Sequence, residues 1–73
     1  MSGRPIKRSL TLAQHRTSVS LEEPFWKAFR KIASEKGNTI NGLAAEIDAG
    51  RGDVGLASAI RVYVLEHLKR KLN

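Results

Sequence analysis

The chain has 73 residues, a formal net charge of +6 at pH 7 and no cysteine. These values allow a single domain, exclude a disulfide-stabilised core and a thiolate metal site, and favour an anionic partner such as nucleic acid. No apolar run approaches the ~20 residues of a membrane-spanning helix, and no apolar stretch follows the basic N-terminus as in a secretory signal, so we expect a cytoplasmic protein with no membrane partner.

Residues 1–13 are expected to form a flexible basic arm ahead of a domain that spans residues 14–73. The segment IKRSLTLAQ has weak β character without a firm alternation, and no internal repeat is apparent along the chain. The basic residues of the arm are Arg4, Lys7 and Arg8. Lys7 and Arg8 are the expected phosphate contacts, with an affinity that falls steeply with salt, and a solubilising tail is the alternative.

The segment HRTSVSL, residues 15–21, alternates as a strand with one polar face. Thr17, Val19 and Leu21 share one side, while Arg16, Ser18 and Ser20 share the other. It is the one strand that the pattern predicts firmly, which leaves its pairing partner open. A chain this short buries little surface alone, so we expect oligomerisation to supply further burial.

Two short helices are expected next, over roughly residues 23–36 and 40–49. In the first, Phe25, Phe29 and Ile32 follow one another at helical spacing. The first helix is expected to end at Gly37, and Thr39 is the expected N-cap of the second helix.

A third helix is expected over roughly residues 55–72. Its apolar row at i+4 spacing consists of Leu56, Ile60, Val64, Leu68 and Leu72. Val62 and Leu65 extend the apolar surface around the helix, which is more than a surface helix needs and indicates contact with a second chain.

The stretch RTSVSLEEPFWKAFRKIASEKGNTIN, from Arg16 to Asn41, resembles the ribbon-helix-helix family of DNA-binding proteins of the MetJ/Arc type. The resemblance implies a mostly α fold with one β-strand, in which two chains intertwine and pair their strands antiparallel. The resulting ribbon lies in the DNA major groove. The third helix lies beyond the usual two-helix core and marks an extended variant, as a dimer or a tetramer.

The resemblance also implies roles for individual residues. Arg16, Ser18 and Ser20 face the DNA bases, while Thr39, Ile40 and Asn41 bind a phosphate at the start of the second helix. The core that the two chains share consists of Val19, Leu21, Phe25, Trp26, Phe29, Ile32, Leu43 and Ile47.

These features predict a sequence-specific regulator of transcription that represses by covering double-stranded DNA. One alternative is an antitoxin or partner-binding module that docks another protein through its C-terminal helix, and a second is a basic protein that binds RNA or a membrane surface. We expect no enzyme, cofactor or metal. The segment GRGDVG, residues 50–55, follows an expected helix rather than the strand of a dinucleotide fingerprint, and the two histidines form no ligand cluster.

Overall fold

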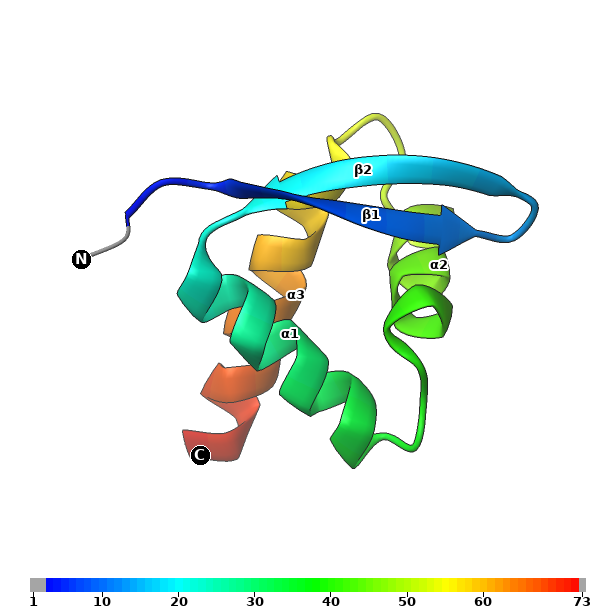
Figure 1. The fold of residues 1–73 in the computed structure, drawn as a ribbon. Helices are drawn as coiled ribbons and strands as arrows, with labels where there is room; N and C mark the ends of the chain where they lie inside the picture. The colour runs from blue at the N-terminus through cyan, green and yellow to red at the C-terminus, as the bar shows by residue number, and fades with distance from the viewer. Residues whose placement is uncertain (1–2, 73) are drawn as a thin grey trace.

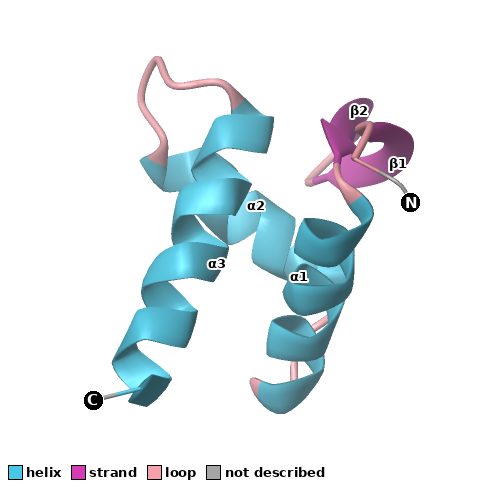
Figure 2. Cartoon of the chain, turned by 90° about the vertical axis from the view of Figure 1, so that its left-hand side faces the viewer, coloured by secondary structure: helices cyan, strands magenta, loops and turns pink. Residues whose placement is uncertain are grey.

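The computed structural model describes residues 3–72. Its elements, in chain order, are the strands β1 (Ile6–Leu12) and β2 (His15–Leu21) and the helices α1 (Glu23–Glu35), α2 (Ile40–Gly50) and α3 (Leu56–Leu72). The strands form an antiparallel hairpin that crosses one side of the three helices (Figures 1 and 2). The helices begin and end within one residue of the predicted bounds.

The first strand corrects the prediction of a flexible arm for Ile6–Leu12. Leu10 and Leu12 are 3% exposed each and anchor β1 on the helices. A two-residue turn joins Leu12 to His15, which pair with each other across the hairpin. The alternation was hard to read in the sequence because Arg8 occupies a position in the otherwise apolar row.

The pairing partner of β2 therefore lies in the same chain. Ile6 is opposite Leu21 at one end of the hairpin, and seven residues of each strand are in register. The sequence analysis expected a strand from a second chain at this position. The mostly α fold with one strand becomes a fold with two strands and three helices.

The start and the end of α1 both follow from local chemistry. Pro24 lies in the first turn of α1, where its missing N–H leaves no hydrogen bond unmade. At the other end Gly37 adopts a φ of +68°, and the N–H of Asn38 donates to the carbonyl of Ala33 at 2.9 Å. This left-handed turn redirects the chain into α2.

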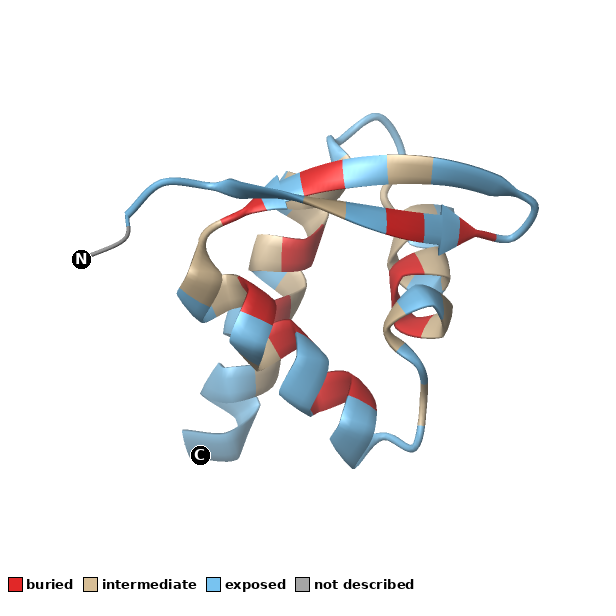
Figure 3. Cartoon of the chain, viewed as in Figure 1, coloured by how far each residue is buried: buried red, intermediate tan, exposed pale blue. Residues whose placement is uncertain are grey.

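The hydrophobic core closes within one chain and draws on all five elements (Figure 3). Of the residues predicted for a core shared by two chains, those buried here are Val19, Leu21, Trp26, Phe29, Ile32 and Leu43. Phe25 and Ile47 are partly buried and pack against them. The side chains that complete the core are Leu10, Leu12, Ala33, Ala44, Ile60 and Val64.

The third helix buries only part of its predicted apolar row. Ile60 and Val64 are buried, whereas Leu68 is 43% and Leu72 86% exposed. Because a helix turns once per 3.6 residues, a row at i+4 spacing drifts by about 40° at each step and leaves the core before the helix ends. None of the helices described is both long enough and apolar enough to cross a membrane.

Candidate nucleic-acid interface

The outward side of the hairpin carries six exposed side chains, which we call the ribbon face. They are Lys7, Ser9 and Thr11 from β1 and Arg16, Ser18 and Ser20 from β2. They form three cross-strand pairs, Lys7 with Ser20, Ser9 with Ser18 and Thr11 with Arg16. The predicted sides of the second strand are thus confirmed, since Val19 and Leu21 point into the core.

The chemistry of the ribbon face is cationic and otherwise small and polar. Lys7 and Arg16 carry its two charges, and none of the six side chains is acidic. Hydroxyl groups donate and accept hydrogen bonds, so Ser and Thr suit either a base edge or a phosphate. A two-stranded ribbon fits the major groove, which is about 12 Å wide, and short side chains allow close approach.

Arg8 lies on the opposite side of β1 and points toward the helices. Its guanidinium makes an ion pair with Glu23 in the first turn of α1 and lies 5.0 Å from the centre of the Trp26 ring. Cations above an aromatic face are attracted by the ring quadrupole. These contacts hold β1 on α1 and leave the predicted phosphate contact of Arg8 without support.

The start of α2 is capped by Thr39, as predicted. Its Oγ1 accepts a hydrogen bond from the N–H of Gly42 at 2.9 Å. No acceptor among the described residues binds the N–H of Ile40 or Asn41, so both point out from the positive end of the helix dipole. A Cβ at position 42 would collide with Asn38 Oδ1 and crowd Thr39 Oγ1, so any larger residue there would have to displace these side chains.

A side-chain hydrogen bond fixes the start of α2 beside the hairpin. The N–H of Thr11 donates to Asn41 Oδ1 at 3.0 Å. Thr11 is paired with Arg16, so the open N–H groups of α2 lie at the end of the ribbon face that carries the arginine. The structure thus places the start of α2, a predicted phosphate contact, next to Arg16, a predicted base contact.

The outer edge of β2 is tied to α3 by Arg61. Its guanidinium donates to both carboxylate oxygens of Glu22, at 2.9 and 3.1 Å, and to the carbonyl of Ser20 at 3.4 Å. The hydrogen bond from Arg61 lowers the pKa of Glu22 below its ordinary value. Each strand is therefore held by a side chain from a helix, β1 by Asn41 and β2 by Arg61.

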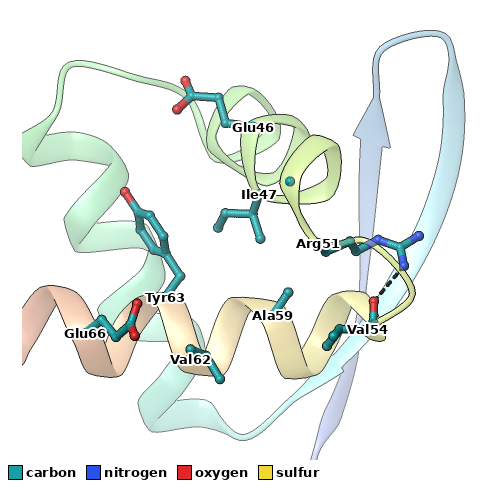
Figure 4. A pocket seen from close by; sticks show the side chains of 9 residues that line it. Glu46, Ile47, Arg51, Val54, Ala59, Val62, Tyr63 and Glu66 are labelled. Atoms are coloured by element: carbon teal, nitrogen blue, oxygen red, sulfur yellow. Dashed lines mark hydrogen bonds between the residues drawn. The ribbon is translucent and has the colours of Figure 1, made fainter.

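A second surface feature is a hollow of about 490 Å³ between α2 and α3 (Figure 4). Ile47, Ala59 and Val62 give it an apolar lining, with Glu46 and Glu66 around them. Arg51 closes the loop at one end by binding Asp48 at 2.6 Å and the carbonyl of Val54 at 2.7 Å. The two carboxylates make this hollow a poor site for a polyanion.

Sequence reasoning missed Ser9 and Thr11 of the ribbon face and the hollow between the helices. The alternation of Ser9 and Thr11 with Leu10 and Leu12 was the available signal for the two side chains. No sequence pattern marked the hollow, because its shape depends on how α2 and α3 cross.

Comparison with known proteins supplies the family. A model of the ribbon-helix-helix domain matches residues 5–68, which includes both strands, α1, α2 and most of α3. No curated protein and no solved structure gave a significant match. Members of this family bind DNA as transcriptional regulators or antitoxins and act as dimers. The chain belongs to the ribbon-helix-helix domain family, whose members are DNA-binding regulatory modules rather than enzymes.

Proposed function

We propose that this protein binds double-stranded DNA in the cytoplasm by laying its ribbon face in the major groove. The observation that carries the proposal is the composition of that face, with two cations, four small hydroxyl side chains and no carboxylate. The open start of α2 lies at one end of it, tied there by the bond between Thr11 and Asn41. Family membership supports the same conclusion.

In this proposal the two ends of the site do different work. Arg16 donates two hydrogen bonds to the O6 and N7 atoms of a guanine, and Ser18 and Ser20 contact neighbouring base edges. The N–H groups of Ile40 and Asn41 bind a backbone phosphate beside the arginine, with Thr39 capping the helix. Lys7 lies on the ribbon face and contacts the DNA there, while Arg8 takes no part.

The biological task that follows is regulation of transcription by occlusion. A ribbon in the major groove covers the DNA that a polymerase must contact, so binding over a promoter represses the gene. Specificity comes from the base contacts, and the net charge of +6 adds affinity that depends on salt.

The experiment is a binding titration with a duplex selected from a random pool. Arg16→Ala should weaken binding to the selected duplex about tenfold or more, because one bidentate contact contributes roughly 1–3 kcal/mol of base discrimination. Binding to a scrambled duplex should fall much less. Arg30→Ala is the matched control, since it removes an exposed arginine from α1, away from the ribbon face. Equal losses for the two variants on the selected duplex would refute base reading by Arg16.

We further propose that this protein forms a dimer through α3, with the intertwined ribbon of the sequence analysis as the alternative. In support, β2 is already paired with β1, and the core closes within one chain. The exposed apolar side chains of α3 include Val62 at 53% and Leu65 at 55%. An α3 interface would bury them without opening the hairpin.

Light scattering at micromolar concentration tests this assembly. Leu65→Lys should give a monomer that keeps the helical circular dichroism of the parent, because the core does not depend on the second chain. Ser34→Lys, an exposed change on α1, should remain a dimer. A Leu65→Lys protein that loses its fold on dissociation would instead support the intertwined dimer.

A second candidate function is docking of a different protein on the same side of the molecule, as in an antitoxin. The observation that favours it is the apolar hollow between α2 and α3, which could accept a side chain from a partner. The α3 dimer and the docking role predict different oligomeric states for the isolated protein. A parent protein that is monomeric at micromolar concentration would leave this surface free and favour the docking role.

A further inference from the structure

The acidic side chains that make no ion pair gather around the hollow between α2 and α3. Of the seven acidic residues in the chain, the four that make ion pairs are Glu22, Glu23, Glu35 and Asp48. Within residues 3–72 the other three, Glu46, Asp53 and Glu66, make none. Glu46 and Glu66 line the hollow, and Asp53 precedes Val54, which also lines it. A protein of net charge +6 thus keeps its unpaired carboxylates in one region.

The two ends of the hollow differ in charge (Figure 4). Glu46 of α2 and Glu66 of α3 lie toward the end that also holds Tyr63. At the other end the guanidinium of Arg51 is engaged within its own loop, where it donates to the carbonyl of Val54 at 2.7 Å. The apolar lining between the ends therefore meets two carboxylates on one side and an occupied cation on the other.

Lys36, at the C-cap of α1, shows that the carboxylate end favours a cation. Its ammonium group donates a hydrogen bond to the hydroxyl oxygen of Tyr63 at 2.9 Å and lies 5.5 Å from the centre of that ring. The hydrogen bond from Lys36 to Tyr63 raises the pKa of Lys36, and the carboxylate of Glu46 raises it further. Glu46 itself accepts a hydrogen bond from the neutral amide of Asn38 at 2.9 Å, so its charge remains available to a second cation.

The apolar surface of the hollow continues along α3 beyond its rim. Val54 and Val62 line the hollow and are 46% and 53% exposed, and Leu65, one turn after Val62, is 55% exposed. Exposed apolar patches bordered by polar residues mark interaction sites. A small molecule in a hollow of about 490 Å³ would leave Leu65 in water, whereas a segment of protein chain covers both the hollow and the surface beside it.

We propose that the hollow docks a basic amphipathic segment of a different protein. An apolar side chain of that segment enters between Ile47 and Val62, and the Lys or Arg side chains on either side of it pair with Glu46 and Glu66. This rests on the second candidate function and adds the chemistry of the partner. None of the six ribbon-face residues is among those that line the hollow, so a docked partner leaves the proposed DNA-binding side chains exposed.

This partner chemistry opposes the net charge of the protein. A net charge of +6 by itself would attract an anionic segment and repel a cationic one. Salt screens such long-range effects over about 8 Å at physiological ionic strength, whereas charges in direct contact inside a hollow are screened much less. Preference for a cationic segment would therefore come from Glu46 and Glu66 and not from the charge of the whole molecule.

The test uses two fluorescent helical peptides with one leucine pattern, one with lysine and the other with glutamate at the polar positions. Binding to the full chain is measured by anisotropy at physiological salt. Glu66→Lys should weaken binding of the lysine peptide about fivefold, because an attraction is replaced by a repulsion of similar size, and should strengthen binding of the glutamate peptide. Ser34→Lys, which also adds an exposed lysine but on α1, should leave both affinities nearly unchanged. Val62→Ser should weaken both peptides, since it removes apolar lining.

Binding of the lysine peptide that is equal in the parent and in Glu66→Lys would overturn the inference. Binding of the glutamate peptide alone, weakened by Val62→Ser, would overturn the cationic partner and retain the docking role. Failure of both peptides to bind would remove the docking role as well, while the DNA titration still decides the main proposal. A parent dimer that Glu66→Lys converts to a monomer in light scattering would assign the hollow to a second copy of the chain and overturn the inference.

Discussion

At the scale of single residues, the hairpin turn contains a local strain. Ala13 has a φ of 53°, and it is the one residue other than glycine with a positive φ in the part of the chain that the structure describes. The left-handed region costs an L-residue with a Cβ roughly 1–2 kcal/mol. The ribbon face depends on this turn, since it sets the register of the two strands.

Ala13→Gly should therefore stabilise the protein by about 0.5–1 kcal/mol, because glycine adopts a positive φ freely although it loses more backbone entropy on folding. Thermal unfolding followed by circular dichroism measures the change. Gln14→Gly is the control, as position 14 has no positive φ and should gain nothing. An equal or larger stabilisation at position 14 would show that relief of strain at Ala13 does not explain the gain.

Glu22 gives the fold a defined response to acid. The hydrogen bond from Arg61 lowers its pKa, so the folded state holds the charged carboxylate more strongly than the unfolded chain does. The stability from this contact is present above the ordinary pKa of glutamate, about 4.3, and is lost as the pH falls through the lowered value.

The parent should thus unfold at a higher temperature than Glu22→Gln at neutral pH, and the difference should shrink below about pH 4. Melting curves at several pH values measure this difference directly. A gap between the two proteins that stays constant into acid would mean that Glu22 acts through its shape and not through its charge.

At the scale of elements, the start of α2 links the fold to the proposed phosphate contact. Asn41 uses Oδ1 to accept the hydrogen bond from Thr11, which leaves its amide N–H₂ and the two open backbone N–H groups for an anion. A substitution at Asn41 that keeps the side-chain oxygen can separate the attachment of α2 to β1 from the proposed binding of a phosphate.

Asn41→Asp keeps an acceptor for the N–H of Thr11 and places a negative charge at the positive end of the helix dipole, which favours folding. The same charge repels a phosphate, so affinity should fall by a similar factor for all DNA sequences, and the slope of log affinity against log salt should decrease by about one. Thermal unfolding serves as the control and should show no loss. An affinity change confined to the selected duplex would contradict a phosphate role.

The third helix has two sides with different uses. Ile60 and Val64 close the core, while Val62 and Leu65 remain exposed on the surface where we propose the dimer forms. The sequence pattern predicted both the burial and the excess of apolar surface. It could not tell which residues of the i+4 row would leave the core, because that depends on the crossing of α3 with α1 and α2.

At the scale of the whole molecule, the helices and the sides of β2 were predictable, and the pairing of β2 was not. Helix ends carry local signals such as Thr39 and Gly37, so they can be read from the sequence. The partner of a strand is a long-range property. Here Arg8 masked the alternation of β1, and its inward position is explained only by Glu23 and Trp26 in the folded chain.

Only part of the candidate site was predicted, again because strand pairing is a long-range property. Arg16, Ser18 and Ser20 follow from the period of one strand, but Ser9 and Thr11 join them only through the register of the hairpin. The core closes within one chain, and the hairpin presents the proposed DNA-binding face on that folded domain.

The most direct test of that account is a titration of the isotope-labelled protein with a selected duplex, followed by amide chemical shifts. The account predicts the largest changes at Lys7, Ser9, Thr11, Arg16, Ser18 and Ser20 and at the N–H groups of Ile40 and Asn41. Residues of α3 that point away from the hairpin, such as Leu65, should change little. Changes concentrated on α3 or around its hollow, with the ribbon face unaltered, would contradict it.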